Sequence, residues 1–142
     1  MKKLLSILCC AVILLSVSSC TKQYVNPVVA NQNKTLTANI ASTDWLAYTD
    51  GKSYYVPINV QELDDASAKY DGVIVSVSYD DGATFEQLPE VYNGLSFSYT
   101  YTGPGSSGNA GVLSIYAQSP DGVTAIKPTD PIVVKIVLVY SE

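Results

Sequence analysis

The sequence contains no histidine, and its eight basic residues are all lysine. Without histidine the usual general base at neutral pH is missing, which excludes Ser-His-Asp and Cys-His arrangements and zinc sites built from histidine. Without arginine, and with a formal net charge of -5, the chain has no basic patch to displace counterions from phosphate and no guanidinium to read guanine. We therefore expect no metal and no nucleic-acid partner.

The enzyme chemistry that remains is that of carboxylates or lysine. Asp64 with Asp65 and Asp80 with Asp81 are adjacent in sequence, so their side chains diverge on a strand or lie in a turn. A glycosidase needs two carboxyl groups from separate elements, roughly 5 to 10 Å apart, and one sequence does not show such a pair. We assign no catalytic residue and favour a non-enzymatic protein, with a carboxylate hydrolase as the alternative.

Cysteine is scarce, and the three cysteines lie near the start of the chain. Lys2 and Lys3 give a positively charged beginning, and an uncharged apolar stretch follows from Leu4 to Val17. This pattern is typical of a secretory signal peptide, and the stretch is shorter than the roughly 20 residues that a spanning helix needs. Cys9 and Cys10 would be removed with it, which leaves no pair for an intramolecular disulfide.

The segment Val17-Ser18-Ser19-Cys20 resembles the lipobox of bacterial lipoproteins. The resemblance implies cleavage between Ser19 and Cys20, a diacylglycerol on the sulfur of Cys20, and an acyl group on the new amine. Such an anchor is stable, because each buried methylene contributes about 0.8 kcal/mol and two chains suffice. An ordinary signal peptide followed by an unmodified cysteine is the alternative.

The chain divides into a signal peptide (1–19), a lipidated cysteine with its tether (20–33) and one domain (34–142). The tether is polar, contains Pro27 and shows no amphipathic period, as expected of a linker. Removing the signal peptide leaves about 120 residues, which is enough for one domain with its own core and too few for two.

The domain alternates between apolar and polar residues with turn signals between the segments, and only Glu62 to Ala68 could form a helical turn. Pro57 cannot donate to a ladder, which predicts a free edge or a bulge. The final segment is apolar on both faces, which predicts a central strand, with Lys135 as a guard against edge pairing. The expected strands are Thr35 to Ile40, Ser53 to Val60, Gly72 to Tyr79, Thr84 to Leu88, Leu95 to Thr102, Val112 to Gln118 and Ile132 to Tyr140.

About seven or eight short strands without crossover helices predict an all-β fold. Faces that alternate this regularly need a second sheet to cover them, which favours an antiparallel β-sandwich, immunoglobulin-like or jelly-roll-like, over a barrel. The cleanest alternation places Leu95, Phe97, Tyr99 and Tyr101 on one face, which we assign to the core rather than to a binding platform.

One motif resembles the Asp-box of sialidases and other secreted β proteins. It runs from Ser78 to Phe85 and matches the pattern S-x-D-x-G-x-T-[WF] through Ser78, Asp80, Gly82, Thr84 and Phe85. We interpret it as a structural hairpin, because an Asp-box aspartate accepts backbone N–H groups across the turn and its glycine adopts positive φ. The alternative is a calcium site built from Asp80, Asp81 and Glu86 with ligands from further elements.

Tyrosine is abundant, with 11 residues, and sugar-binding modules use tyrosine and tryptophan rings as stacking platforms. Tyr55 and Tyr116 lie on the less apolar face of their strands, and Trp45 lies in a connection between strands. These three residues are the candidates for glycan contact. The alternative for Trp45 is that it fills the core at one end of the sandwich.

The whole chain resembles the short lipoproteins of Bacteroidota, in which a lipobox is followed by a tether and one β-sandwich. The likeness is carried by the lipobox, the Trp45 to Pro57 region, the Gly72 to Leu88 hairpin and the closing Ile132 to Val139 strand. It implies an outer-membrane protein anchored by its lipid. Acidic residues after the cysteine accompany export to the surface in that group, and Thr21 to Tyr24 lacks them, which favours the periplasmic face.

These observations predict a membrane-anchored, non-enzymatic binding module of the cell envelope that contacts another envelope protein, for example by strand addition at an open edge. The alternative is a glycan-binding lipoprotein that uses exposed aromatic side chains. A fimbrial subunit is less favoured, since Bacteroidota fimbrillins are longer and mature by cleavage after arginine. No cofactor is expected besides the lipid on Cys20.

Overall fold

The computed structural model describes residues 33–108 and 110–141. The predicted signal peptide, its cleavage point between Ser19 and Cys20, and the tether up to residue 32 lie outside the described residues. Within the described ranges, no helix is long and apolar enough to cross a membrane.

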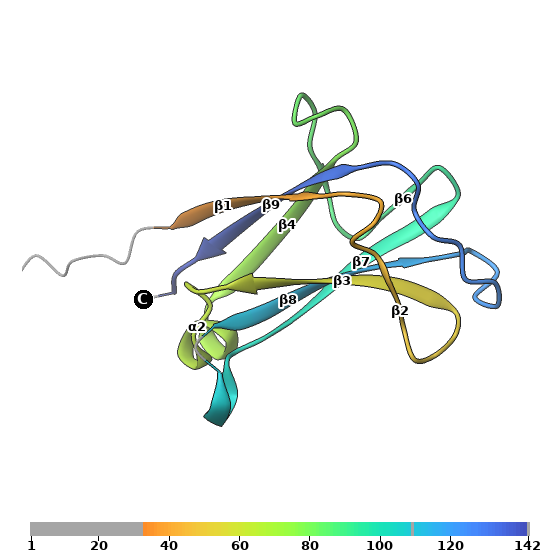
Figure 1. Cartoon of the computed structure of the whole chain (residues 1–142). Helices are drawn as coiled ribbons and strands as arrows, with labels where there is room; N and C mark the ends of the chain where they lie inside the picture. The colour runs from red at the N-terminus through yellow and green to blue at the C-terminus, as the bar shows by residue number, and fades with distance from the viewer. Residues whose placement is uncertain (1–32, 109, 142) are drawn as a thin grey trace, which may run out of the picture. The chain divides into compact units, whose positions relative to one another are not determined.

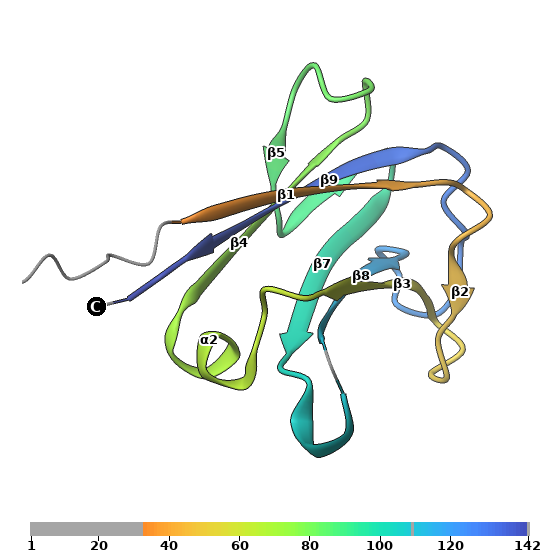
Figure 2. The same cartoon turned by 60° about the vertical axis from the view of Figure 1, so that its left-hand side comes forward.

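The domain consists of two antiparallel sheets that face each other, as Figures 1 and 2 show. Sheet A has four strands in the order β1-β9-β4-β5, and sheet B has five in the order β2-β3-β8-β7-β6. The predicted all-β sandwich is therefore confirmed. The bounds are β1 Lys34–Ile40, β2 Leu46–Ala47, β3 Ser53–Val60, β4 Gly72–Ser78, β5 Glu86–Gln87, β6 Glu90–Tyr92, β7 Leu95–Thr102, β8 Gly111–Gln118 and β9 Ile132–Val139, with a helix α2 at Asp65–Tyr70 and a 3-10 turn at Gly105–Ser107.

The nine strands in this part of the chain exceed the seven predicted by residue range because two short strands were not expected. These two, β2 and β6, have two and three residues, too few to show an alternation in the sequence. The strand expected from Thr84 to Leu88 is reduced to the two-residue β5. The remaining predicted strands agree with the structure to within about two residues, the usual precision of strand ends.

The last strand, β9, is central in sheet A, as predicted, because it pairs with β1 on one side and β4 on the other. The role assigned to Lys135 is wrong, since a strand with two neighbours has no edge to guard. The ammonium group of Lys135 instead lies 3.9 Å from the ring centroid of Phe85, a cation–π contact that connects the outer face of sheet A to the Asp-box hairpin.

Pro57 lies where the sequence predicts, on a free edge. β3 pairs with β8 along its whole length, whereas β2 covers its other side only opposite Tyr54 and Tyr55. The remainder of β3, including Pro57, has no second strand neighbour. The missing N–H of Pro57 therefore costs no ladder hydrogen bond on that side.

The core lies between the inner faces of the two sheets, and Leu95 and Phe97 belong to it as predicted. Tyr99 bridges the layers, because its hydroxyl donates a hydrogen bond of 2.8 Å to the carbonyl oxygen of Val73. The largest side chains with almost no exposed surface come from β4, β8, β9 and the turn before α2: Leu63, Val75, Val77, Leu113, Ile115, Val134, Ile136 and Leu138.

The possible helical turn near Glu62 is realised as α2, one turn further along the chain. Its N-cap is Asp64, whose carboxylate accepts the backbone N–H of Ser67 at 2.7 Å. This bond satisfies one of the N–H groups that a helix start leaves free. It also lowers the pKa of Asp64, although a smaller loss of hydration opposes the shift.

The two ends of the sandwich differ in what they carry. We call the end where the described chain begins, β1 starts and α2 packs the proximal end. There the backbone N–H of Tyr140 donates a hydrogen bond of 3.2 Å to Oδ1 of Asn33. The start and the end of the domain therefore lie side by side (Figure 1). The distal end holds the connections that follow β1, β2, β4, β6 and β8. Asn33, where the described chain begins, therefore lies at the end of the sandwich opposite these connections.

Candidate functional site

The Asp-box hairpin has the hydrogen bonds of a structural turn. Asp80 Oδ1 accepts the hydroxyl of Ser78 at 2.7 Å and the backbone N–H of Thr84 at 2.8 Å. The hydroxyl oxygen of Ser78 in turn accepts a hydrogen bond of 2.8 Å from the backbone N–H of Gly82. Gly82 has a φ of 87°, a positive value that glycine adopts without a Cβ clash. The hydrogen bonds that Asp80 accepts, of which the one from Ser78 contributes most, lower its pKa to about 2. Phe85 does not enter the core; it is half-buried beside Lys135.

The calcium alternative for this hairpin gains no geometric support. Oδ1 of Asp80 is already used twice within the turn. In the ranges that the structure describes, no group of three or more acidic, cysteine or histidine side chains is placed to hold a metal ion. Asp81 has a positive φ of 58°, as a residue within a tight turn can have.

Two carboxyl groups do lie close together, at Glu86 on β5 and Glu90 on β6. Burial and the neighbouring carboxyl of Glu86 raise the pKa of Glu90. The hydroxyl of Tyr79 donates a hydrogen bond of 2.6 Å to Oε1 of Glu90. Burial is the larger cause and this hydrogen bond the second cause of the raised pKa of Tyr79. Neither carboxyl lines either of the two hollows at the distal end. Glu90 orients Tyr79 through their hydrogen bond.

Trp45 is not available for glycan contact. Its side chain is 2% exposed, and its ring meets that of Phe97 edge to face at 6.1 Å. Its Nε1 has no hydrogen-bond partner, which places the whole indole inside the core. The prediction of a stacking platform at Trp45 is wrong, because the short segment before β2 turns this side chain inward.

Tyr55 and Tyr116, the other two candidates, are brought together on the outer face of sheet B. They are direct cross-strand neighbours in β3 and β8, with ring centroids 6.1 Å apart and planes 23° from parallel. Tyr48, which no sequence pattern indicated, completes a cluster. Its ring centroid lies 5.5 Å from that of Tyr55 and 5.4 Å from that of Tyr116. We call these three residues the tyrosine cluster. Tyr48 is 38% exposed, so the cluster meets solvent.

A second surface lies on the open side of the sandwich, between β1 and β3. All seven residues of β1 pair with β9 on one side, and no strand lies on the other. β1 has no proline and no charge after Lys34, so it carries few of the features that protect edge strands. The hollow between the two edges measures about 260 Å³. We call it the edge groove, and its apolar lining is Leu36, Ala38, Ile58, Val60 and Ile136.

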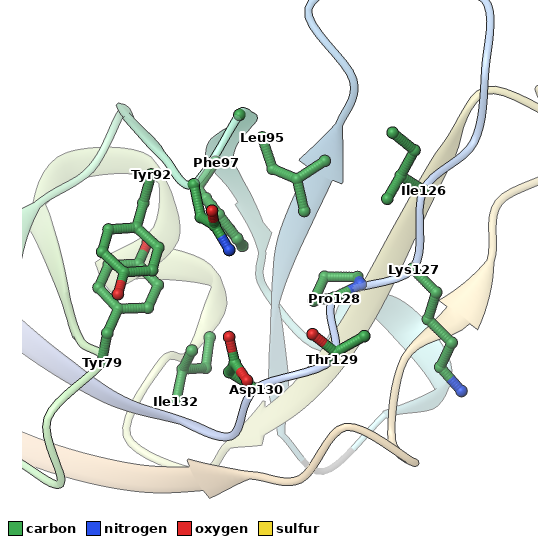
Figure 3. A pocket seen from close by; sticks show the side chains of 12 residues that line it. Tyr79, Tyr92, Leu95, Phe97, Ile126, Lys127, Pro128, Thr129, Asp130 and Ile132 are labelled. Atoms are coloured by element: carbon green, nitrogen blue, oxygen red, sulfur yellow. The ribbon is translucent and has the colours of Figure 1, made fainter.

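The third surface is a hollow of about 280 Å³ at the distal end, the distal pocket (Figure 3). Leu95, Phe97 and Ile132 form its apolar floor, and all three are buried. One wall is the face-to-face pair of Tyr79 and Tyr92, with ring centroids 3.6 Å apart and planes 6° from parallel. The opposite wall is the segment that leads toward β9, from residue 126 to residue 130.

Polar groups stand around the rim of the distal pocket. Asn93 follows β6, and Thr129 and Asp130 precede β9; all three are exposed. Figure 3 shows Thr129 and Asp130 across the hollow from Tyr92 and Phe97, whereas the side chain of Lys127 points away. The pocket therefore combines an apolar floor and an aromatic wall with uncharged and acidic groups at its mouth.

Comparison with known proteins gives no match: the chain matches no protein-family model, no curated protein and no solved structure. The three surfaces must therefore be judged by their own geometry and chemistry. The edge groove offers backbone hydrogen-bonding groups, the tyrosine cluster offers aromatic rings on a sheet face, and the distal pocket offers both apolar and polar contacts.

Proposed function

We propose that this protein is a lipid-anchored, non-enzymatic binding module of the cell envelope that takes up an extended segment of another envelope protein at the edge groove. Its anchor in this proposal is the acylated Cys20, in the outer membrane and facing the periplasm. The observation that carries the proposal is the free edge of β1 above an apolar groove.

The chemistry of the groove specifies the kind of partner. The unpaired N–H and C=O groups of β1 are satisfied best by another β-strand, and strand addition supplies affinity through such main-chain bonds. Successive side chains of an added strand point to opposite faces, so every second one would enter the groove beside Leu36, Ala38 and Ile58. The partner segment is therefore extended, about five to seven residues long, with apolar residues at alternate positions.

In-cell photocrosslinking tests this proposal on the full chain. A photoreactive amino acid replaces Thr35 on β1, and a control replaces Gln118, which is exposed on β8 but has strand neighbours on both sides. We expect one discrete adduct from position 35 that position 118 does not give. Ala38→Lys, which fills the groove, should reduce the adduct about tenfold. Asn39→Lys, on the opposite face of the same strand and outside the groove lining, should retain most of it. An adduct that survives Ala38→Lys would contradict strand addition.

The tyrosine cluster favours a second candidate function, glycan binding. Aromatic rings in half-exposed clusters bury a large apolar area with little loss of conformational freedom, and a pyranose ring has an apolar face that can cover them. A glycan array probed with the full chain tests this function. Tyr116→Ala should abolish binding, and Tyr70→Ala, an exposed tyrosine on α2 at the proximal end, should leave it unchanged.

A further inference from the structure

The distal pocket differs from the other two surfaces because it joins a buried apolar floor and an aromatic wall to a polar rim. Its volume of about 280 Å³ lies near the lower end of the range for small-molecule sites, roughly 300 to 1,000 Å³. A ligand that fills it is therefore about the size of one ring. The proposal that follows does not depend on the edge groove or on the tyrosine cluster.

The aromatic wall is held in place before any ligand arrives. Tyr79 is fixed by its hydrogen bond to Glu90 and by an edge contact with Phe97, with ring centroids 5.7 Å apart. Tyr92 stacks on Tyr79 with one face and is still 38% exposed, so its other face is the free one. A preorganised wall loses little side-chain entropy on binding.

The polar rim requires a ligand with hydrogen-bonding groups on its edge. Among the residues that the structure describes, the side chains of Asn93, Thr129 and Asp130 make none of the hydrogen bonds found between side chains or to backbone. They are therefore available to a ligand, with Asp130 as an acceptor for two hydroxyl groups and Asn93 as both donor and acceptor.

The charge around the pocket excludes an anionic ligand. Asp130 lies at its rim, and a neighbouring hollow that shares Tyr79 and Ile132 carries Asp44, Asp80 and Asp81. The one basic residue that lines the distal pocket is Lys127, and its side chain points away from the hollow in Figure 3. Phosphate, sulfate or carboxylate groups would thus meet like charge and no cation.

We infer that the distal pocket binds a single uncharged saccharide ring. A pyranose combines an apolar C–H face, which suits Tyr92 and the floor of Leu95 and Phe97, with hydroxyl groups around its edge, which suit Asn93, Thr129 and Asp130. Because the pocket is closed below by the core, it takes a ring at the end of a glycan chain rather than one within it. Its position at the distal end keeps it away from the point where the tether joins.

Saturation-transfer NMR and titration calorimetry on the full chain test this inference. The detergent is a polyoxyethylene type without sugar or choline head groups. The probes are methyl glycosides of neutral hexoses, glucuronic acid as an anion of similar size, and choline as a smaller cation. For about twelve heavy atoms we expect saturable binding of a neutral glycoside with a dissociation constant on the order of 1 mM, and no saturable binding of glucuronic acid or choline.

Variants locate the site. Tyr92→Ala and Asp130→Asn should each weaken binding at least about tenfold, whereas Tyr70→Ala should leave it unchanged. If circular dichroism shows that Tyr92→Ala does not fold, the result for Asp130→Asn decides. Binding of no neutral glycoside would overturn the inference, as would tighter binding of choline. Loss of binding in Tyr116→Ala with none in Asp130→Asn would also overturn it and assign the sugar to the tyrosine cluster. Photocrosslinking at β1 is unaffected by any of these outcomes.

Discussion

The two sheet edges on the open side of the sandwich are built differently. β3 is protected over its first half by β2 and further along by Pro57, which lacks an N–H for a new partner. β1 has seven residues, one terminal lysine and no proline. Natural sheets commonly protect exposed edges with charges, prolines or covering segments. The contrast within one small domain supports the proposal that β1 takes a partner strand at its open edge.

The protection of β3 depends on the core. Trp45 immediately precedes β2 and is buried against Phe97, which fixes the two-residue strand beside Tyr54 and Tyr55. β1 has no such cover, and the inward-facing Leu36 and Ala38 are only partly buried. The edge of β3 is thus covered by a strand that the core holds in place, whereas the edge of β1 stays open above the edge groove.

The largest effect should come from the central strand beside each edge. Ile136 on β9 pairs with Leu36 of β1, and Ile115 on β8 pairs with Val56 of β3; both are almost completely buried. Truncation to alanine should cost about 2 to 5 kcal/mol. Ile136 borders the edge groove, so the cavity that its truncation leaves can open to water and relax. The loss of stability in Ile136→Ala should therefore lie at the low end of this range, and that in Ile115→Ala at the high end. Urea unfolding measures both, and equal losses would contradict the difference.

Removing the protection of β3 should make the two edges alike. Pro57→Thr gives β3 an N–H at its free edge and a residue with high β propensity. We expect self-association at least about tenfold tighter than that of the wild-type chain, measured by sedimentation velocity. Pro120→Thr, which changes an exposed proline in the turn after β8, serves as the control. No change in Pro57→Thr would mean that this edge is protected by other means.

The turns at the ends of the two sheets should respond alike to acid. Asp80 follows β4 of sheet A and Asp121 follows β8 of sheet B, and hydrogen bonds lower both pKa values to about 2. A lowered pKa contributes stability that is present above the unfolded value near 4 and is lost as pH falls toward 2. In urea titrations from pH 6 to pH 2, Asp80→Asn and Asp121→Asn should each flatten the loss of stability. Curves parallel to the wild type would contradict this assignment.

The smallest effect is expected at the residue that supports β2. Trp45→Phe keeps an aromatic ring against Phe97 and removes the Nε1–H that has no partner. The lost volume and the removed unpaired donor act in opposite directions, so the free energy of unfolding should change by less than about 1.5 kcal/mol. A loss above about 3 kcal/mol, measured by urea unfolding, would show that the indole has a function in the core that the ring alone does not supply.

Much of the fold could be predicted because alternation is a local signal. The long strands, the place of β9 and the free edge at Pro57 all follow from residue type and spacing. The edge of β1 could not be predicted, since strand order depends on contacts between residues far apart in sequence. The same limit explains Lys135, whose assigned role required an edge that β9 does not have.

The candidate site was predictable only in part. Tyr55 and Tyr116 lie on the polar face of their strands, as their alternation indicated, and the register of β3 with β8 brings them together. Trp45 lies in a connection, where no periodicity indicates the direction of a side chain, so its burial could not be read from the sequence. The stack of Tyr79 on Tyr92 requires the short β6, which has too few residues to show a pattern.

Residue-resolved amide hydrogen exchange on the full chain, at low protein concentration, tests the open edge of β1 most directly. In an edge strand, every second N–H points away from its neighbour. We therefore predict an alternating pattern along Lys34–Ile40, with fast exchange at every second residue, beside uniform protection of the amides of β9. Uniform protection of β1 would contradict the account, because it would mean that its second edge is already occupied.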